Sequence, residues 1–324
     1  MVKTLTIAGK EIKNRYIQAP LAGYSSQAMR EMGRRYGAGL VYTEMTSATA
    51  LVYHNEKTFA MLPRHEEKNV ALQIFGGDIP TILKCIPIIE TESEYDFLDF
   101  NCGCPVKKVI KQKAGSSWLL RPDELYNLAR SMVKISAKPV LFKIRLGFDN
   151  EHRNYLSIAK LLEDAGVKAI AVHGRTRAEG FGGEVDYQAI AEIKKELSIP
   201  VIANGNISLA NIDQVMNITQ ADGYMIGRQS IGNPKIFEDL IYHEEGKQIV
   251  KASIDKLIDD VLIHLDLLID EFGETVACRM MRSFVSLYLK GVYNIKPYKI
   301  KLVRANTKKE YVDILRELKA SQII

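Results

Sequence analysis

Eight short apolar segments, each followed at once by glycine or polar residues, recur between residues 16 and 227 of this chain. Helical patterns separate them, and this alternation is typical of parallel strands that helices cover on their outer side. Roughly 240 residues for eight such units predict an α/β fold of the (β/α)8 TIM-barrel class. A doubly wound open sheet is the alternative, but no Gly-x-Gly-x-x-Gly turn follows the first strand. The eight segments are residues 16–19, 40–43, 70–75, 97–100, 140–145, 169–174, 200–205 and 223–227.

The last quarter of the chain has a different pattern. Leucine, isoleucine and valine repeat at helical spacing over residues 257–269 and again at Leu315 and Leu318. We therefore expect a barrel domain over residues 1–243 and a small C-terminal helical domain over 244–324, divided at a polar stretch. Acids dominate residues 255–274, whereas residues 275–309 contain no acid and nine Lys or Arg. A solvated helix face would explain such a run, but the lack of interspersed acids favours a surface that contacts a polyanion.

Composition limits the setting in which the protein works. The chain has 324 residues, of which 47% are hydrophobic, and this is enough to bury a large core. Its net charge is +5. The four cysteines lack the spacing of a disulfide framework, no signal peptide opens the sequence, and no apolar run is long enough to span a bilayer. A cytoplasmic monomer without membrane contact is the expectation.

The ends of the seventh and eighth strands carry small and polar residues suited to an anion. Asn204-Gly205-Asn206 follows one strand and Gly227-Arg228 follows the other. Glycines let backbone N–H groups approach an anion closely, and an arginine adds a forked cationic donor. Barrels of this class commonly bind phosphate at these two strand ends. A ligand that bears a phosphate is therefore predicted.

Polar side chains on three other strands point to a flat ring beside that phosphate. Lys143 and Arg145 lie two residues apart on one strand and so face the same side. Ion pairs with Glu44 or Asp99 are the alternative explanation of these cations, and His173 alone could be a core histidine. Together, Gln73, Lys143 and His173 offer hydrogen-bond donors to a polar ring, which favours flavin mononucleotide (FMN) over a sugar phosphate.

The segment Asn101-Cys102-Gly103-Cys104-Pro105 places an amide and two thiols at a strand end. A metal site lacks further ligands, because Cys85 and Cys278 are remote in sequence. A nucleophilic cysteine lacks an evident base. A thiol with a pKa near ~8.5 is protonated at neutral pH and can donate a proton to a substrate. Cys104 is the predicted proton donor, and Cys102 is expected to pack in the core.

The motifs taken together resemble those of the tRNA-dihydrouridine synthases, most closely the bacterial B-type subfamily. The resemblance spans nearly the whole barrel and rests on several motifs in order. They are Ala19-Pro20-Leu21-Ala22-Gly23, the Asn101–Pro105 segment with Lys107-Lys108-Val109, Lys143-Ile144-Arg145, Glu151-His152-Arg153-Asn154, His173-Gly174-Arg175-Thr176-Arg177, Asn204-Gly205-Asn206 and Gly227-Arg228.

The resemblance implies a flavin-dependent reduction of uridine to dihydrouridine in RNA, with NADPH as the reductant of FMN. It implies that Cys104 protonates C5 while the flavin delivers hydride to C6, and that Asn101 and Arg145 contact the target base. Transfer RNA is the first expected substrate and ribosomal RNA the second. The implied FMN-binding residues are Pro20, Leu21, Ala22, Gln73, Lys143, His173, Asn204, Gly205, Asn206, Gly227 and Arg228.

Basic residues in two places are expected to hold the RNA backbone. Those at the barrel mouth are Lys107, Lys108, Arg175 and Arg177, and those in the helical domain are Arg279 and Arg282.

Three positions depart from the family pattern. Leu21 stands where methionine is usual, and Asn206 stands where aspartate is usual. Ser283 follows Arg282 where a basic residue and histidine are commonly adjacent, which weakens the inference about how the helical domain binds RNA. Two other functions stay open: a flavin barrel that reduces a free pyrimidine or small enone, as dihydroorotate dehydrogenases do, and a non-catalytic RNA-binding factor.

Overall fold

Parallel strands close into a barrel in the computed structural model, which describes residues 2–64 and 67–322. The strands pair in the order β4-β3-β11-β10-β9-β8-β7-β6, and a further pairing of β4 with β6 closes the ring. The short strand β5 (Thr46–Ser47) extends the edge of β6. The predicted TIM barrel is confirmed, and all eight predicted strands are present. They are β3 (Tyr16–Gln18), β4 (Leu40–Tyr42), β6 (Val70–Phe75), β7 (Phe97–Cys102), β8 (Val140–Arg145), β9 (Ala169–His173), β10 (Val201–Asn204) and β11 (Gly223–Ile226).

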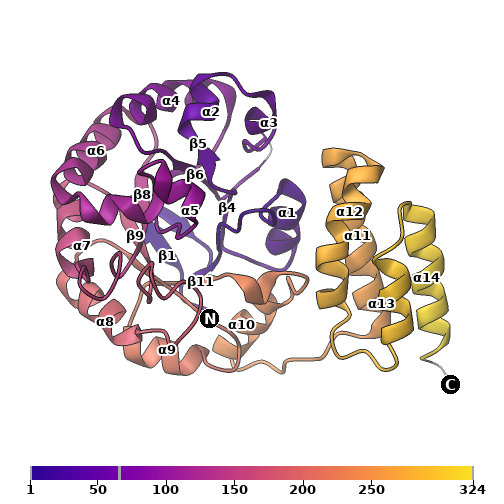
Figure 1. Ribbon diagram of the computed structural model, residues 1–324. Coiled ribbons are helices and arrows are strands. Elements are labelled where there is room, and N and C mark those ends of the chain that lie inside the picture. Colours follow the sequence, from indigo (N-terminus) through magenta and orange to yellow (C-terminus); the bar gives the residue numbers. More distant parts are fainter. Residues whose placement is uncertain (1, 65–66, 323–324) are drawn as a thin grey trace.

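Helices surround the barrel, which Figure 1 shows along its axis. The predicted helix near residues 123–130 is α6, which begins with Pro122 and has Asp123 and Glu124 in its first turn, where they favour the helix N-terminus. The helix predicted from Tyr155 is α7, and Gly166 follows its end with φ 96°, as a helix stop does. The longer barrel helices are α1 (Gln27–Arg35), α4 (Ile79–Glu92), α6 (Pro122–Ile135), α7 (Tyr155–Asp164), α8 (Tyr187–Glu196), α9 (Ile212–Thr219) and α10 (Ile236–Glu244).

Short helices lie in the loops, and sequence periodicity did not predict them. They are α2 (Ala48–Val52), α3 (Glu56–Phe59), α5 (Lys107–Lys111), and the 3₁₀ turns η1 (Gly115–Leu120) and η2 (Arg228–Ser230). Both α5 and η1 follow the Cys104 segment and shape the loop that carries it.

The barrel interior is apolar at one end and polar at the other. An antiparallel hairpin, β1 (Leu5–Ile7) with β2 (Lys10–Ile12), closes the apolar end, and its Leu5 and Ile7 pack in one cluster with interior residues such as Phe97 and Leu141. Because side chains two apart face the same side of a strand, the polar residues that follow along each strand project into the opposite end. The hairpin therefore supplies the apolar floor above which the polar site is built.

Four further helices form a domain beside the barrel (Figure 1). They are α11 (Ile254–Phe272), α12 (Glu274–Tyr288), α13 (Lys296–Leu302) and α14 (Lys308–Ala320). Among the described residues, no helix has both the length and the apolar character needed to cross a membrane.

The helical domain contacts the barrel mainly through α1. The Glu271 carboxylate of α11 accepts hydrogen bonds from the backbone N–H groups of Gln27 (3.1 Å) and Ala28 (2.9 Å), which are otherwise unpaired donors at the start of α1. At the pocket side, Phe284 of α12 packs edge-on against Tyr24, with ring centroids 5.4 Å apart. The helical domain therefore reaches the wall of the pocket described next.

Candidate active site

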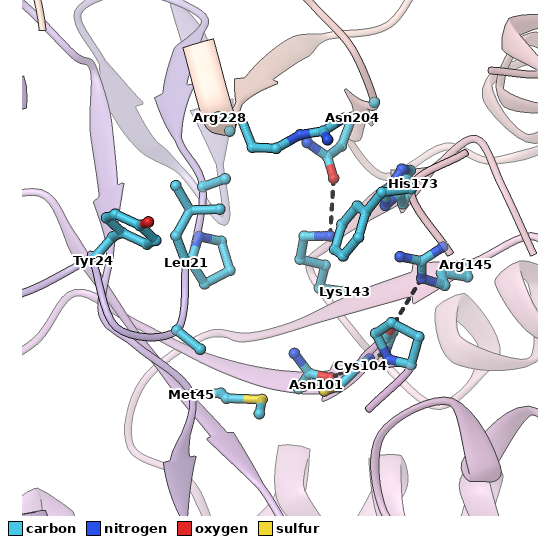
Figure 2. Close-up of a pocket in the computed structure, with 18 of the residues that line it drawn as sticks. Leu21, Tyr24, Met45, Asn101, Cys104, Lys143, Arg145, His173, Asn204 and Arg228 are labelled. Carbon is cyan, nitrogen blue, oxygen red and sulfur yellow. Dashed lines mark hydrogen bonds between the residues drawn. The ribbon is translucent and has the colours of Figure 1, made fainter. Parts of the chain in front are cut away.

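A cavity of about 630 Å³ lies at the carboxyl ends of the barrel strands. That volume falls within the range of roughly 300–1,000 Å³ that is usual for cofactor and ligand sites. Figure 2 shows Leu21 and Tyr24 on one side of it and His173 and Arg145 on the other. The predicted site residues that line it are Pro20, Leu21, Ala22, Gln73, Asn101, Cys104, Lys143, Arg145, His173, Asn204, Gly205, Asn206, Gly227 and Arg228.

The turns after β10 and β11 form one end of the cavity. Gly205 has φ 128°, and a Cβ there would lie 3.0 Å from Val185 and 3.1 Å from the His173 ring, so this turn requires glycine. The exposed Arg228 donates a hydrogen bond from Nη2 to Oδ1 of Asn206 at 2.9 Å. Because the Asn206 side chain is neutral, it does not offset the positive charge that Arg228 presents to an anion.

Lys143 crosses the middle of the cavity. Its Nζ donates to Oδ1 of Asn204 at 3.0 Å (Figure 2), and the Asn204 amide in turn donates to the backbone carbonyl of Met225 at 2.8 Å. The side-chain partner of Lys143 is therefore an amide, not the carboxylate of Glu44 that the sequence also allowed; Glu44 accepts from the backbone of Gly23 instead. Burial, and then the nearby Arg145, lower the pKa of Lys143 to about 8.

His173 is a neutral imidazole at the rim of the same cavity. The residue is 6% exposed. Burial, followed by the positive charges of Lys143, Arg145, Arg175 and Arg228, lowers its pKa to about 2. Its ring can therefore offer one donor and one acceptor at every physiological pH.

Cys104 lies on a loop that several backbone contacts hold. Its N–H donates to Oδ1 of Asn101 at 2.9 Å, and its carbonyl accepts from the N–H of Ser116 at 3.2 Å. Gly115 has φ 59° and lies close to the Cys104 carbonyl oxygen, from which a Cβ at this position would be only 2.8 Å away, so this turn requires glycine. Burial raises the pKa of the Cys104 thiol, so the group keeps its proton at neutral pH. Cys102 is fully buried in the outer core and does not line the cavity.

Arg145 forms hydrogen bonds to two loops beneath the cavity mouth. Its Nε donates to the carbonyl of Gly103 at 2.7 Å, and its Nη1 donates to the carbonyls of Thr176 and Gly180, each at 2.8 Å. The side chain is 2% exposed. Arg145 therefore holds the cysteine loop against the β9–α8 loop, while it also lines the cavity.

The residues expected to contact RNA differ in exposure. Lys107 and Lys108 are exposed on α5, Arg279 is exposed on α12, and Arg177 is half-buried with its guanidinium 4.7 Å from the Phe148 ring. Arg282 is half-buried and donates to the Asn306 side chain at 2.8 Å.

Arg175 departs from the expectation of a surface cation. It is 1% exposed, and its Nη2 donates to the carbonyl of Gly183 at 2.6 Å. The alternation along the strand end turns this side chain inward, so it holds the β9–α8 loop instead of facing solvent. The prediction that Arg175 contacts RNA phosphates is corrected accordingly.

Several cavity-lining side chains were not among the predicted site residues, and the aromatic and sulfur-containing ones are Tyr24, Met45 and Phe181. Phe181 is 58% exposed, and its ring lies 5.4 Å from the Arg145 guanidinium and 5.3 Å from that of Arg228. An aromatic residue among Gly180, Gly182 and Gly183 in a strand-to-helix loop was the available signal. Tyr24 and Met45 follow the first two predicted strands, and strand-end position alone could have identified them.

Comparisons with known proteins agree with this geometry. The family model for dihydrouridine synthase (Dus) matches residues 17–323. The chain belongs to the dihydrouridine synthase family. It is 39% identical over 293 residues to tRNA-dihydrouridine synthase B of Pasteurella multocida, covering 89% of this chain and 87% of that protein. It is 37% identical to tRNA-dihydrouridine synthase B of Vibrio cholerae, with 88% of this chain and 89% of that protein covered. The resemblance drawn from the motifs is confirmed.

Solved structures with the same architecture are more distant in sequence. The old yellow enzyme homologue of Zymomonas mobilis aligns with a TM-score of 0.56 at 13% identity, covering 78% of this chain and 95% of that one. The old yellow enzyme of Trypanosoma cruzi aligns with a TM-score of 0.53 at 12% identity, covering 77% and 93%. These similarities establish the shared barrel fold.

Proposed function

We propose that this protein reduces the C5=C6 bond of specific uridines in tRNA to 5,6-dihydrouridine, with FMN as cofactor and NADPH as reductant. The observation that carries the proposal is the family match, which spans the barrel and the helical domain. The cavity supports it, because Cys104 and Lys143 place a protonated thiol and a buried ammonium group in its lining. FMN-dependent reduction of a free pyrimidine or small enone is the competing function.

The donor set of the cavity suits FMN. Pro20, Leu21 and Ala22 supply an apolar wall, while Gln73, Lys143 and His173 supply polar groups at the opposite side. The turns at Asn204–Asn206 and Gly227–Arg228 would hold the phosphate, because their glycines leave the backbone accessible and Arg228 adds a cation.

Bound FMN, reduced by NADPH, would supply the hydride that C6 of uridine accepts. The Cys104 thiol would donate the proton that C5 accepts and would be left as a thiolate that solvent reprotonates, so that the C5=C6 double bond becomes a single bond with one new C–H bond on each carbon. The raised pKa of Cys104 keeps that proton in place before reaction. The ammonium of Lys143 would stabilise negative charge on the cofactor ring, and Arg145 would hold the cysteine loop in register with the base.

The RNA would contact both domains, with the cofactor in the barrel of residues 1–243 and basic residues of 244–324 on the RNA backbone. A uridine must leave its stack to reach a buried cavity, which costs a few kcal/mol. Contacts between the RNA phosphates and Lys107, Lys108, Arg177, Arg279 and Arg282 would offset that cost. We place the protein in the cytoplasm as a monomer, where its RNA substrate and NADPH are found.

Substrate size tests the proposal. Purified protein loaded with FMN should oxidise NADPH in the presence of folded, unmodified tRNA far faster than with uridine or UMP, and its apparent affinity for tRNA should fall steeply with salt. Mapping dihydrouridine in tRNA and rRNA from cells with and without the gene would identify the positions. Equal turnover of UMP and tRNA at low and high salt would contradict the proposal and favour the small-substrate reductase.

A further inference from the structure

A carboxylate lies in the middle of the barrel, below the residues assigned to the reaction. Asp99 is on β7, two residues before Asn101, and is 0% exposed. Burying a carboxylate is costly unless its charge and its hydrogen-bonding capacity are used. The proposed reaction gives Asp99 no role, although Gln73 of β6, Asn101 of β7 and Lys143 of β8 line the cavity.

A chain of hydrogen bonds leads from Asp99 to the backbone of Cys104. Oδ2 of Asp99 accepts from Nε2 of Gln73 at 2.7 Å, and Oε1 of Gln73 accepts from Nδ2 of Asn101 at 2.9 Å. Oδ1 of Asn101 then accepts from the backbone N–H groups of Gly103 (3.1 Å) and Cys104 (2.9 Å). The chain connects β6 and β7 to the cysteine loop without a break.

The direction of this chain is determined at the end formed by the cysteine loop. A backbone N–H can only donate a hydrogen bond, so Oδ1 of Asn101 accepts, the Asn101 NH2 donates to Gln73, and the Gln73 NH2 donates to Asp99. The Gln73 and Asn101 amides therefore have a single orientation that satisfies both ends. In that orientation each amide keeps one unused N–H, and both residues line the cavity. The cavity thus presents donors to the ring edge of a ligand, which must offer acceptors there.

The charge of Asp99 acts on Lys143. Burial raises the pKa of Asp99 to about 7, and the Gln73 hydrogen bond and the Lys143 charge oppose that rise. Asp99 in turn favours the protonated form of Lys143, against burial and Arg145. Two other titratable groups near Asp99 are Tyr42 of β4 and Cys102 of β7. Burial raises the pKa of both groups, and the negative charge of Asp99 raises it further.

Two polar atoms at this depth have no hydrogen-bond partner within the described part of the chain. They are Oδ1 of Asp99 and the hydroxyl oxygen of Tyr42. A buried polar group left unpaired costs stability, and such groups concentrate where function requires them. The site therefore keeps a carboxylate that packing alone would disfavour.

We propose that Asp99 is a positioning residue of the active site: its carboxylate orients the Gln73 and Asn101 amides and thereby holds the Cys104 loop. The need to hold that loop rests on the proposed function of Cys104, whereas the hydrogen-bond chain concerns the protein alone. Substitutions that retain or remove the acceptor at Asp99 test the proposal.

Asp99→Asn keeps an acceptor for Gln73 and removes the charge, whereas Asp99→Leu removes both. Phe97→Leu, one interior position earlier on the same strand, is the control for general loosening of the barrel. Alkylation of Cys104 by iodoacetamide, followed by peptide mass spectrometry on the FMN-free protein, reports the loop without any turnover.

The loss of one buried hydrogen bond, about 1.4 kcal/mol, corresponds to roughly tenfold faster alkylation in Asp99→Leu. Asp99→Asn and Phe97→Leu should stay within about twofold of wild type, a difference below ~0.5 kcal/mol. Wild-type alkylation in a folded Asp99→Leu would overturn the proposal.

If Asp99→Leu does not fold, Asp99→Ala, which also removes the acceptor, is used in its place and should be alkylated roughly tenfold faster than wild type. Faster alkylation in Asp99→Asn than in Phe97→Leu would contradict the amide orientation described above. Failure of the protein to reduce uridine would not affect the alkylation result, so the two proposals fail separately.

Discussion

The ammonium group of Lys143 on β8 donates a hydrogen bond to Oδ1 of Asn204 on β10, 3.0 Å away. This bond spans β9 and joins the part of the cavity suited to a ring to the turn suited to a phosphate. It also leaves two N–H groups of Lys143 free. The same side chain can therefore be fixed by the protein and still contact a ligand.

Lys143→Met should lower the midpoint potential of bound FMN by roughly 30–60 mV, since removing one buried cation destabilises the reduced, more negative ring by about 1.4–3 kcal/mol. Lys143 is protonated below about pH 8 and loses its charge above it, so the gap between wild type and variant should narrow at higher pH. Spectroelectrochemical titration measures this. Lys138→Met, at an exposed lysine before the same strand, is the control and should behave as wild type.

Cys104→Ala should slow oxidation of the reduced enzyme by tRNA by roughly 10²–10⁴-fold, the usual contribution of a positioned acid. Reduction of FMN by NADPH should stay unchanged, because that step needs no proton from the thiol. Rapid mixing with tRNA and with NADPH separates the two half-reactions. Cys102→Ala, at a buried core position, is the matched control; an equal effect of both substitutions would contradict the assignment.

The raised pKa of Cys104 predicts a flat pH profile for the same half-reaction. The thiol keeps its proton over the whole range below its ordinary pKa of about 8.5, and burial extends that range upward. The rate constant for uridine reduction should therefore not fall between about pH 6 and pH 8. A rate that falls through neutral pH would mean that another group supplies the proton.

Arg279→Gln should weaken tRNA binding and reduce the slope of log K against log salt by about 1, as the loss of one phosphate contact does. Arg279 is the cleaner target, since Arg282 also holds Asn306 through a hydrogen bond. Filter binding at several salt concentrations gives the slope. Arg316→Gln, on the outermost helix α14 with its side chain 78% exposed, is the control and should leave the slope unchanged.

Glu271→Gln should raise the melting temperature near pH 8 by about 2 °C and leave it unchanged near pH 4. Burial raises the pKa of Glu271 in the folded protein, so the folded state binds the proton more tightly and stability falls as the pH rises above 4.5. Glutamine removes the charge and, like the protonated carboxyl group, keeps one C=O acceptor for the two N–H groups that donate to Oε1 and Oε2 of Glu271. Asp270→Asn, at an exposed neighbour, is the control; a pH-independent gain would contradict this reading.

Local patterns in the sequence were sufficient to predict the barrel and its strand ends. Continuous apolar runs stopped by glycine or polar residues identified all eight strands, and helical spacing identified α11 and part of α14. The hairpin β1–β2 was not predicted, because two three-residue strands carry too little periodic signal. The helices α5 and η1, which shape the Cys104 loop, were not predicted for the same reason, because they too are short.

The sequence by itself determined which strand ends reach the cavity, because the carboxyl ends of parallel strands in a barrel all lie at one face. Tertiary structure alone decided how those residues pair: Lys143 with Asn204, Asp99 with Gln73, and Tyr24 with Phe284 of another domain. It also turned Arg175 inward. Strand order and strand ends follow from local periodicity, whereas a pairing depends on register, barrel closure and domain docking, which bring together residues far apart in the chain.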